Sequence, residues 1–104
     1  MNIVYDKLVR DKIPEIIEAS GKTAVVSTAT DEEYLDRLRA KLSEEVQEYA
    51  AGGDIEELAD IVEVVSALAH ASGSSLEGVL ELAAVKRAER GGFDKRVVLI
   101  RVEA

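Results

Sequence analysis

Three consecutive segments of this chain place apolar residues three and four positions apart, and each is bounded by residues that start and stop helices. The first is the clearest, because Thr30 and Glu33 form a capping box and Gly52 and Gly53 end the segment. Its apolar positions are Leu35, Leu38, Leu42, Val46 and Tyr49. This spacing follows the period of an amphipathic helix and not the alternation of a strand. The pattern therefore predicts a long helix that starts after Thr30.

Two more helices of the same kind are predicted further along the chain. The second begins at a capping sequence, residues 54–57, and continues to about His70. Apolar residues surround much of its axis, which is typical of the central helix of a bundle. The third begins at the capping sequence 74–77 and ends at Gly91. We expect His70, the sole histidine, to interact with the negative end of the second helix dipole.

The remaining stretches are shorter. A helix is predicted from Pro14 to Gly21, because proline suits the first turn of a helix and glycine its C-terminal end. Residues 2–6 are expected to be extended. Residues 23–28 and 96–102 are rich in β-branched side chains, and we expect two short strands that pair with each other or with the N-terminus. The sequence therefore predicts an all-α fold class: a single domain over residues 1–104, with about four helices in a bundle and a small β-strand appendage.

The size and charge of the chain limit its function. With 104 residues it can bury only a modest core, so dimerisation would be a natural supplement. A formal charge of −8 argues against nucleic-acid and membrane-surface binding. It allows a small anionic ligand that is held through a metal ion. The sequence has no cysteine, and it has no apolar stretch long enough for a membrane span, so we expect a cytoplasmic location.

Five acidic residues fall where two neighbouring helices are expected to meet. Glu45 lies beside the apolar stripe of the first long helix, Glu48 follows one turn later, and Glu44 lies on the outer side. Glu57 and Asp60 repeat the three-residue spacing on the next helix. The connection between these helices is so short that they must pack antiparallel, which brings the carboxylates together. Such crowding favours a Mg²⁺ site, because a divalent ion offsets the repulsion and the burial of the carboxylates.

Each acid also has an ordinary interpretation. Glu57 could close a capping box with Asp54, and the pattern supports this equally well. Glu44 and Glu48 could be solvated surface residues, which is the commoner fate of glutamate on a helix. Asp60 fits an ordinary role least, because aspartate is a poor helix former and its neighbours are apolar. The metal hypothesis therefore depends on the two matched pairs and not on any single acid.

Basic residues form a second candidate group. Lys86 and Arg90 continue the apolar stripe of the last helix, where a bundle would normally place leucine. Their ordinary roles would be to reach the solvated rim or to stabilise the helix C-terminus. Lys7, Arg10 and Lys12 form a basic cluster in an acidic protein, and this cluster could equally be ordinary charged surface. Together these cations could bind phosphates and stabilise the charge that develops on a leaving pyrophosphate.

The acidic pattern resembles a known signature. EExxE at residues 44–48, followed by ExxD at residues 57–60, is similar to the motif of the all-α nucleoside triphosphate pyrophosphohydrolases, the MazG-like superfamily. Further stretches resemble a compact branch of that superfamily, whose members are called phosphoribosyl-ATP pyrophosphohydrolase-like or house-cleaning enzymes: residues 5–17, 56–69 and 86–99. The resemblance covers nearly the whole chain.

This resemblance implies Mg²⁺-dependent hydrolysis of a standard or modified nucleoside triphosphate to the monophosphate and pyrophosphate, with Mn²⁺ as an alternative ion. The implied metal ligands are Glu45, Glu48, Glu57 and Asp60. The implied catalytic residue is Glu44 or Glu45, which would orient or deprotonate the attacking water. The implied phosphate-binding residues are Lys86, Arg90, Lys7 and Arg10. It also implies a homodimer or a higher homo-oligomer with helices from two subunits around each site. One departure is that only eight residues separate Glu48 from Glu57.

Two other functions fit the same sequence. One is a non-catalytic sensor that binds a nucleotide or a metal ion without turnover. The other is a helical interaction module, such as an antitoxin-like or adaptor protein, in which the acids lie on the surface. The hydrolase is favoured because Asp60 and Lys86 occupy faces that a passive bundle would make apolar. A covalent route is not expected, since the chain has no cysteine and no serine beside a plausible base.

Overall fold

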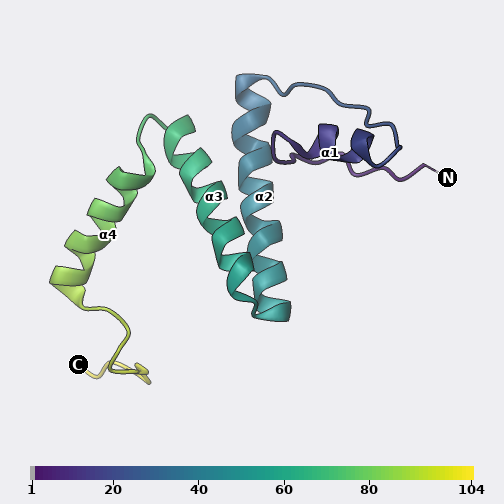
Figure 1. Cartoon of the computed structure of the whole chain (residues 1–104). Coiled ribbons are helices and arrows are strands. Elements are labelled where there is room, and N and C mark those ends of the chain that lie inside the picture. Colours follow the sequence, from purple (N-terminus) through teal and green to yellow (C-terminus); the bar gives the residue numbers. More distant parts are fainter. Residues whose placement is uncertain (1) are drawn as a thin grey trace.

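The computed structural model describes residues 2–104, and within that range the chain forms helices and no strand (Figure 1). Residue 1 of the predicted domain lies outside the described residues. The four helices are α1 (Ile13–Ala19), α2 (Asp31–Gly52), α3 (Ile55–Ala71) and α4 (Leu76–Arg90). The all-α prediction is confirmed, and the predicted ends of the three long helices agree with the structure to within about two residues.

The capping residues act largely as the sequence predicts. Thr30 accepts a hydrogen bond from the Glu33 amide at 3.2 Å, and α2 ends at Gly53, whose φ of 73° is left-handed. At the start of α3, by contrast, Asp54 occupies the N-cap without a side-chain cap hydrogen bond within the described chain. The capping-box interpretation of Glu57 is therefore not realised, which leaves its carboxylate available for another role.

The predicted β-strand appendage is not formed. Residues 23–28 and 96–102 are irregular, and within residues 2–104 they pair with no strand. Their β-branched side chains are exposed, as at Val25 and Val97, which are 94% and 83% accessible. High β-propensity reflects packing on a pleated surface, and a lone strand without a partner edge is not stable in water. The strand prediction is therefore wrong for this chain.

The helices α2 and α3 form an antiparallel pair, and this pair carries the core (Figure 1). The short turn at Gly53 reverses the chain between them. The helix α3 also packs against the start of α4, so it is the central helix that its apolar surface predicts. Among the described residues α1 packs against no other helix. The buried apolar residues are Leu38, Val64 and Ala69.

The molecule is elongated, and much of its apolar surface stays open. Its radius of gyration is 18.3 Å, whereas a compact domain of this length has a value of about 13 Å. The helix α4 diverges from the pair, so that its apolar positions are exposed, with Leu80, Leu82 and Val85 at 58%, 64% and 53% (Figure 1). No helix in the described chain is long and apolar enough to cross a membrane.

Candidate carboxylate site between α2 and α3

The centre of the site is Glu45, a buried charged residue beside the small core. It lies on the face of α2 that also carries Tyr34, Leu38 and Lys41, and only 7% of the residue is exposed. One carboxylate oxygen lies 3.4 Å from the Lys41 ammonium. The other oxygen, Oε2, is buried and has no hydrogen-bond partner in the described chain. A buried carboxylate oxygen without a partner is costly, which marks Glu45 as a candidate ligand group.

Other acids crowd around Glu45. Burial raises the pKa of Glu45, and the adjacent Glu48 carboxylate raises it further. Burial also raises the pKa of Glu57, and the negative charges of Asp54, Asp60 and Glu45 add to the effect. The Glu57 Oε2 atom is a second buried oxygen without a partner among the described residues. The structure therefore brings carboxylates of α2 and α3 close enough to disfavour one another's charge.

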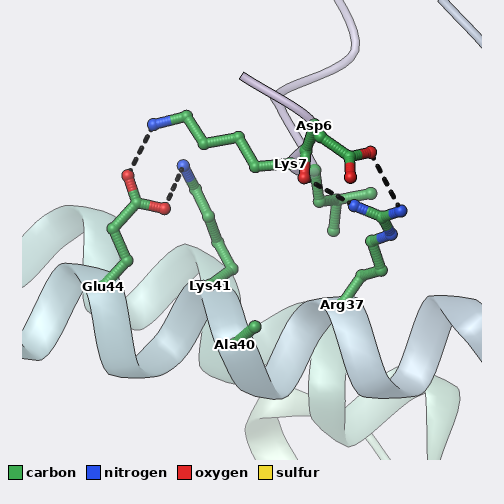
Figure 2. Close-up of a pocket in the computed structure, with 7 residues that line it drawn as sticks. Asp6, Lys7, Arg37, Ala40, Lys41 and Glu44 are labelled. Atoms are coloured by element: carbon green, nitrogen blue, oxygen red, sulfur yellow. Dashed lines mark hydrogen bonds and ion pairs between the residues drawn. The ribbon is translucent and has the colours of Figure 1, made fainter. Parts of the chain in front are cut away.

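Glu44 lies in a different environment on the outer side of the same turn. Lys7 donates to one of its oxygens at 2.6 Å, and Lys41 donates to the other at 3.4 Å (Figure 2). The hydrogen bond from Lys7 lowers the pKa of Glu44, and the same bond raises the pKa of Lys7. Glu44 is thus held as an ion between two ammonium groups, whereas Glu45 is a buried carboxylate that resists ionisation.

Asp60 completes the set from α3. The Arg10 guanidinium donates to its Oδ1 atom at 2.7 Å. The two predicted phosphate-binding residues of the N-terminus, Lys7 and Arg10, therefore lie at the carboxylates, three residues apart on one segment and bound to different helices. The segment is thus bound to α2 through Glu44 and to α3 through Asp60.

Cations of the chain itself pair with three of the acids at this site. Within residues 2–104 no three carboxylate or imidazole side chains are arranged to hold a metal ion. Lys7, Lys41 and Arg10 offset part of the repulsion through ion pairs with Glu44, Glu45 and Asp60, and the divalent ion stays a prediction. Lys41 is not among the residues predicted for the site. The signal for it is its position three and four residues before Glu44 and Glu45, which is the spacing of helical ion pairs.

The N-terminal segment is fixed by a contact that no local pattern predicts. Arg37 donates to the Asp6 carbonyl oxygen at 2.7 Å and to its carboxylate at 3.2 Å (Figure 2). Asp6 has a φ of 43°, a left-handed conformation that aspartate tolerates better than most residues. Lys7 emerges from this turn toward Glu44 along a small cavity of about 80 Å³. Arg37 therefore determines where the following cations lie.

A larger cavity of about 280 Å³ lies between the N-terminal segment, α2 and α3. The charged groups at its wall are two cations and four acids: Arg10, Lys41, Asp11, Glu45, Asp60 and Glu63. Apolar and aromatic side chains also line it: Leu8, Val9, Tyr34, Leu38, Val64 and Ala67. Such a mixed cavity has the composition of a small-molecule site, in which apolar walls are combined with a few polar groups.

The structure does not bring every predicted residue to this site. Glu48 is exposed on α2, although it is close enough to Glu45 to raise the pKa of that residue. Lys86 and Arg90 are exposed on the C-terminal half of α4, which diverges from α3 (Figure 1). Their role in phosphate binding stays a prediction. His70 lies in the last turn of α3, where its predicted interaction with the helix dipole requires it.

Known proteins match this chain over part of its length. A curated relative, an uncharacterised protein from Mycolicibacterium smegmatis, is 58% identical to the chain over 45 residues. The match covers 43% of this chain and 46% of the relative's length. No protein-family model matches the chain, and no solved structure matches it. Since the relative is uncharacterised, this similarity assigns no activity, and the proposal below depends on the site and on the sequence pattern.

Proposed function

We propose that the chain is a Mg²⁺-dependent hydrolase that converts a nucleoside triphosphate to the monophosphate and pyrophosphate in the cytoplasm. The observation that carries the proposal is the buried Glu45 carboxylate with an unpartnered oxygen beside a cavity of about 280 Å³. Arg10 and Lys41 line this cavity and offer cations for phosphate, while Tyr34 offers a surface for an aromatic ring. The similarity of the acidic pattern to the MazG-like superfamily supports the same function.

The donor set of the site suits Mg²⁺. All candidate ligands are carboxylate oxygens, and two of these atoms, on Glu45 and Glu57, are buried without a hydrogen-bond partner in the described chain. The sequence pattern adds Glu48 and Asp60, and these four residues would hold the ion. When bound, the ion would neutralise phosphate charge and lower the pKa of coordinated water. Arg10 has to leave Asp60 for the full donor set to become available.

The pKa directions distinguish the two candidate bases. The two lysines at Glu44 lower the pKa of that carboxylate, which weakens it as a proton acceptor. Burial raises the pKa of Glu45, so a proton on this residue is better tolerated. We therefore favour Glu45 over Glu44 as the carboxylate that orients the attacking water, in addition to its role as a ligand of the ion. The reaction hydrolyses the P–O–P bridge between the first and second phosphates. If water attacks the first phosphorus, pyrophosphate leaves with the bridging oxygen. If water attacks the second phosphorus, pyrophosphate gains the water oxygen and the monophosphate keeps the bridging oxygen.

We further propose that the functional unit is a homodimer or a higher homo-oligomer. The chain buries few apolar residues, and the apolar face of α4 is open. A monomer with so small a core would be marginally stable. A second copy would cover this face, and it could bring Lys86 and Arg90 to the carboxylates of its partner. These two cations would then contact phosphate as the sequence predicts.

A second candidate function is a non-catalytic nucleotide sensor. The specific observation in its favour is that no set of three metal ligands is assembled within residues 2–104, while Glu44 and Asp60 are paired with cations. A sensor would bind nucleotide in the same cavity without turnover. It would give a calorimetric binding signal and no pyrophosphate.

The experiment that separates these functions is a substrate panel. The purified protein is incubated with Mg²⁺ or Mn²⁺ and with standard nucleotides, modified nucleotides and phosphoribosyl-ATP, and pyrophosphate is measured. We expect release from at least one substrate, and loss of release in Glu45→Gln. Glu56→Gln is the matched control, because Glu56 is an exposed acid of α3 outside the site. The absence of pyrophosphate with every substrate would contradict the hydrolase.

A further inference from the structure

The N-terminal segment at residues 6–12, which we call the strap, is held to the rest of the molecule by polar side chains. The helix that follows it, α1, packs against no other helix in the described chain (Figure 1). Leu8 is the half-buried residue of the strap, and the other positions are exposed. A segment with so little apolar burial can separate from the protein at low cost.

Three contacts define the strap. At its start Asp6 is bound by Arg37 through two hydrogen bonds of 2.7 and 3.2 Å (Figure 2). Beyond this anchor, Lys7 binds Glu44 at 2.6 Å and Arg10 binds Asp60 at 2.7 Å. The anchor is made by a helix residue outside the carboxylate site, whereas the next two contacts are made by residues of that site. The strap is thus tethered at one end and bound to the acids along its length.

The two ion pairs are suited to exchange. The Lys7 and Glu44 side chains are 40% and 29% exposed, and those of Arg10 and Asp60 are 56% and 41% exposed. Ion pairs that are open to solvent contribute little and are easily displaced. Beside them, the Glu45 side chain is only 9% exposed and keeps an oxygen without a partner in the described chain. The site therefore combines a weakly held surface layer of cations with a buried carboxylate that has no cation of its own at Oε2.

We propose that the strap has two roles in turn. It first competes with the metal ion for the carboxylates, and it then donates hydrogen bonds to the phosphates. Without ligand, Arg10 occupies Asp60, one of the four proposed ligands, and Lys7 neutralises the neighbouring Glu44. When the metal and triphosphate bind, Asp60 turns to the metal, and the released Arg10 and Lys7 bind phosphate oxygens. Arg37 keeps the strap at the site throughout. The first half of this inference rests on the metal site of the proposed function, and the second half rests on its nucleotide substrate as well.

The two roles have opposite consequences when the cations are removed. Loss of Lys7 and Arg10 removes the competitor, so a larger fraction of molecules is competent to bind the metal ion alone and its apparent affinity rises. The same loss removes two charged donors from the phosphates, so nucleotide binding weakens. A strap that only stabilises the fold would shift neither quantity in this paired way.

The test is the variant Lys7→Met/Arg10→Gln, with Mn²⁺ titrated in the absence of nucleotide and free Mn²⁺ followed by electron paramagnetic resonance. We expect about three- to tenfold tighter Mn²⁺ binding than in the wild type. In the pyrophosphate assay we expect KM to rise by about tenfold. The control Lys12→Met/Lys22→Gln removes the same charge from two exposed positions. If the control tightens Mn²⁺ binding equally, general electrostatics explains the effect and the competitor role is wrong.

A second measurement follows the motion and does not depend on hydrolysis. The chain has no cysteine, so the double variant Glu15→Cys/Glu56→Cys carries spin labels at one position on α1 and one position on α3 and nowhere else. We expect Mg²⁺ to broaden or shift the distance distribution between the labels, as the Arg10 contact to α3 is released. A distribution unchanged by saturating Mg²⁺ would overturn the strap. If the strap responds but no substrate of the panel is hydrolysed, the competitor role stands and the hydrolase fails.

Discussion

Glu45 and Lys41 lie one turn apart on α2, and the lysine reaches one carboxylate oxygen at 3.4 Å while the other oxygen is buried without a partner among the described residues. The pair is therefore half satisfied. Only 17% of the Lys41 side chain and 9% of the Glu45 side chain are exposed, so water supplies little of the missing solvation. A cation that binds at the open oxygen would therefore relieve this unfavourable energy of the ligand-free molecule.

The first prediction concerns Glu45→Gln, which keeps the shape of the side chain and removes its buried charge. Without metal, we expect the free energy of unfolding at neutral pH to rise by about 1 kcal/mol, because desolvation of the charge is relieved. With Mg²⁺, the wild type should gain thermal stability and the variant should not, since the ion binds the native state through this residue. Thermal unfolding with and without Mg²⁺ checks both, and Glu56→Gln should resemble the wild type. A Glu45→Gln protein that is less stable than the wild type without metal would contradict the prediction.

The second prediction gives the pH dependence of that difference. The pKa of Glu45 in the folded protein is raised above its usual value of 4.5, so its favourable contribution is complete below that value and is lost as pH rises through the folded pKa. Glutamine does not titrate. The advantage of Glu45→Gln should therefore be absent at about pH 4 and grow toward pH 7. Urea unfolding of both proteins across this range checks it, and an advantage that shrinks with rising pH would be the wrong sign.

Glu44 gives the opposite sign in the same experiment. Its folded pKa is lowered by Lys7, so it contributes stability above 4.5 that is lost as pH falls through the lowered pKa. The variant Glu44→Gln should therefore lose stability relative to the wild type at neutral pH. Because the Glu44 side chain is 29% exposed, we expect the loss to be smaller than the Glu45→Gln gain.

The sequence predicts the local structure well and the long-range contacts poorly. The capping of α2 at Thr30 and its end at Gly53 depend on neighbouring residues, and both are confirmed. The antiparallel pair follows from the short turn, so the acids of α2 and α3 do approach one another. The pairing of Arg37 with Asp6, 31 positions apart, has no local signal. The strands at 23–28 and 96–102 fail for a related reason, because a strand depends on a partner that the local sequence does not specify.

The third prediction tests Lys41, which contacts both Glu44 and Glu45. The variant Lys41→Met keeps the apolar stem and removes the ammonium group, which leaves the buried Glu45 without a counter-charge. We expect a loss of about 1 to 3 kcal/mol in the free energy of unfolding without metal. In the Glu45→Gln background the same change should cost less, because no buried charge is left. Equal costs in the two backgrounds would show that Lys41 acts through packing and not through Glu45.

The fourth prediction asks whether one site is built from two copies of the chain. Lys86 and Arg90 lie on the C-terminal half of α4, which diverges from α3, so within one molecule they lie away from the carboxylate site (Figure 1). We expect Glu45→Gln and Lys86→Ala/Arg90→Ala to be inactive each on its own. If α4 serves the site of a partner, a mixed dimer combines one intact Glu45 with one intact pair of cations, and the other site carries both defects. Random exchange of subunits should then restore about a quarter of the wild-type activity.

Pyrophosphate release after co-refolding measures this directly. The control is a co-refolded mixture of Glu45→Gln and Glu57→Gln, which should restore nothing, since both residues lie in the same half of the site. Failure of the first mixture to regain activity would place Lys86 and Arg90 outside the neighbouring site.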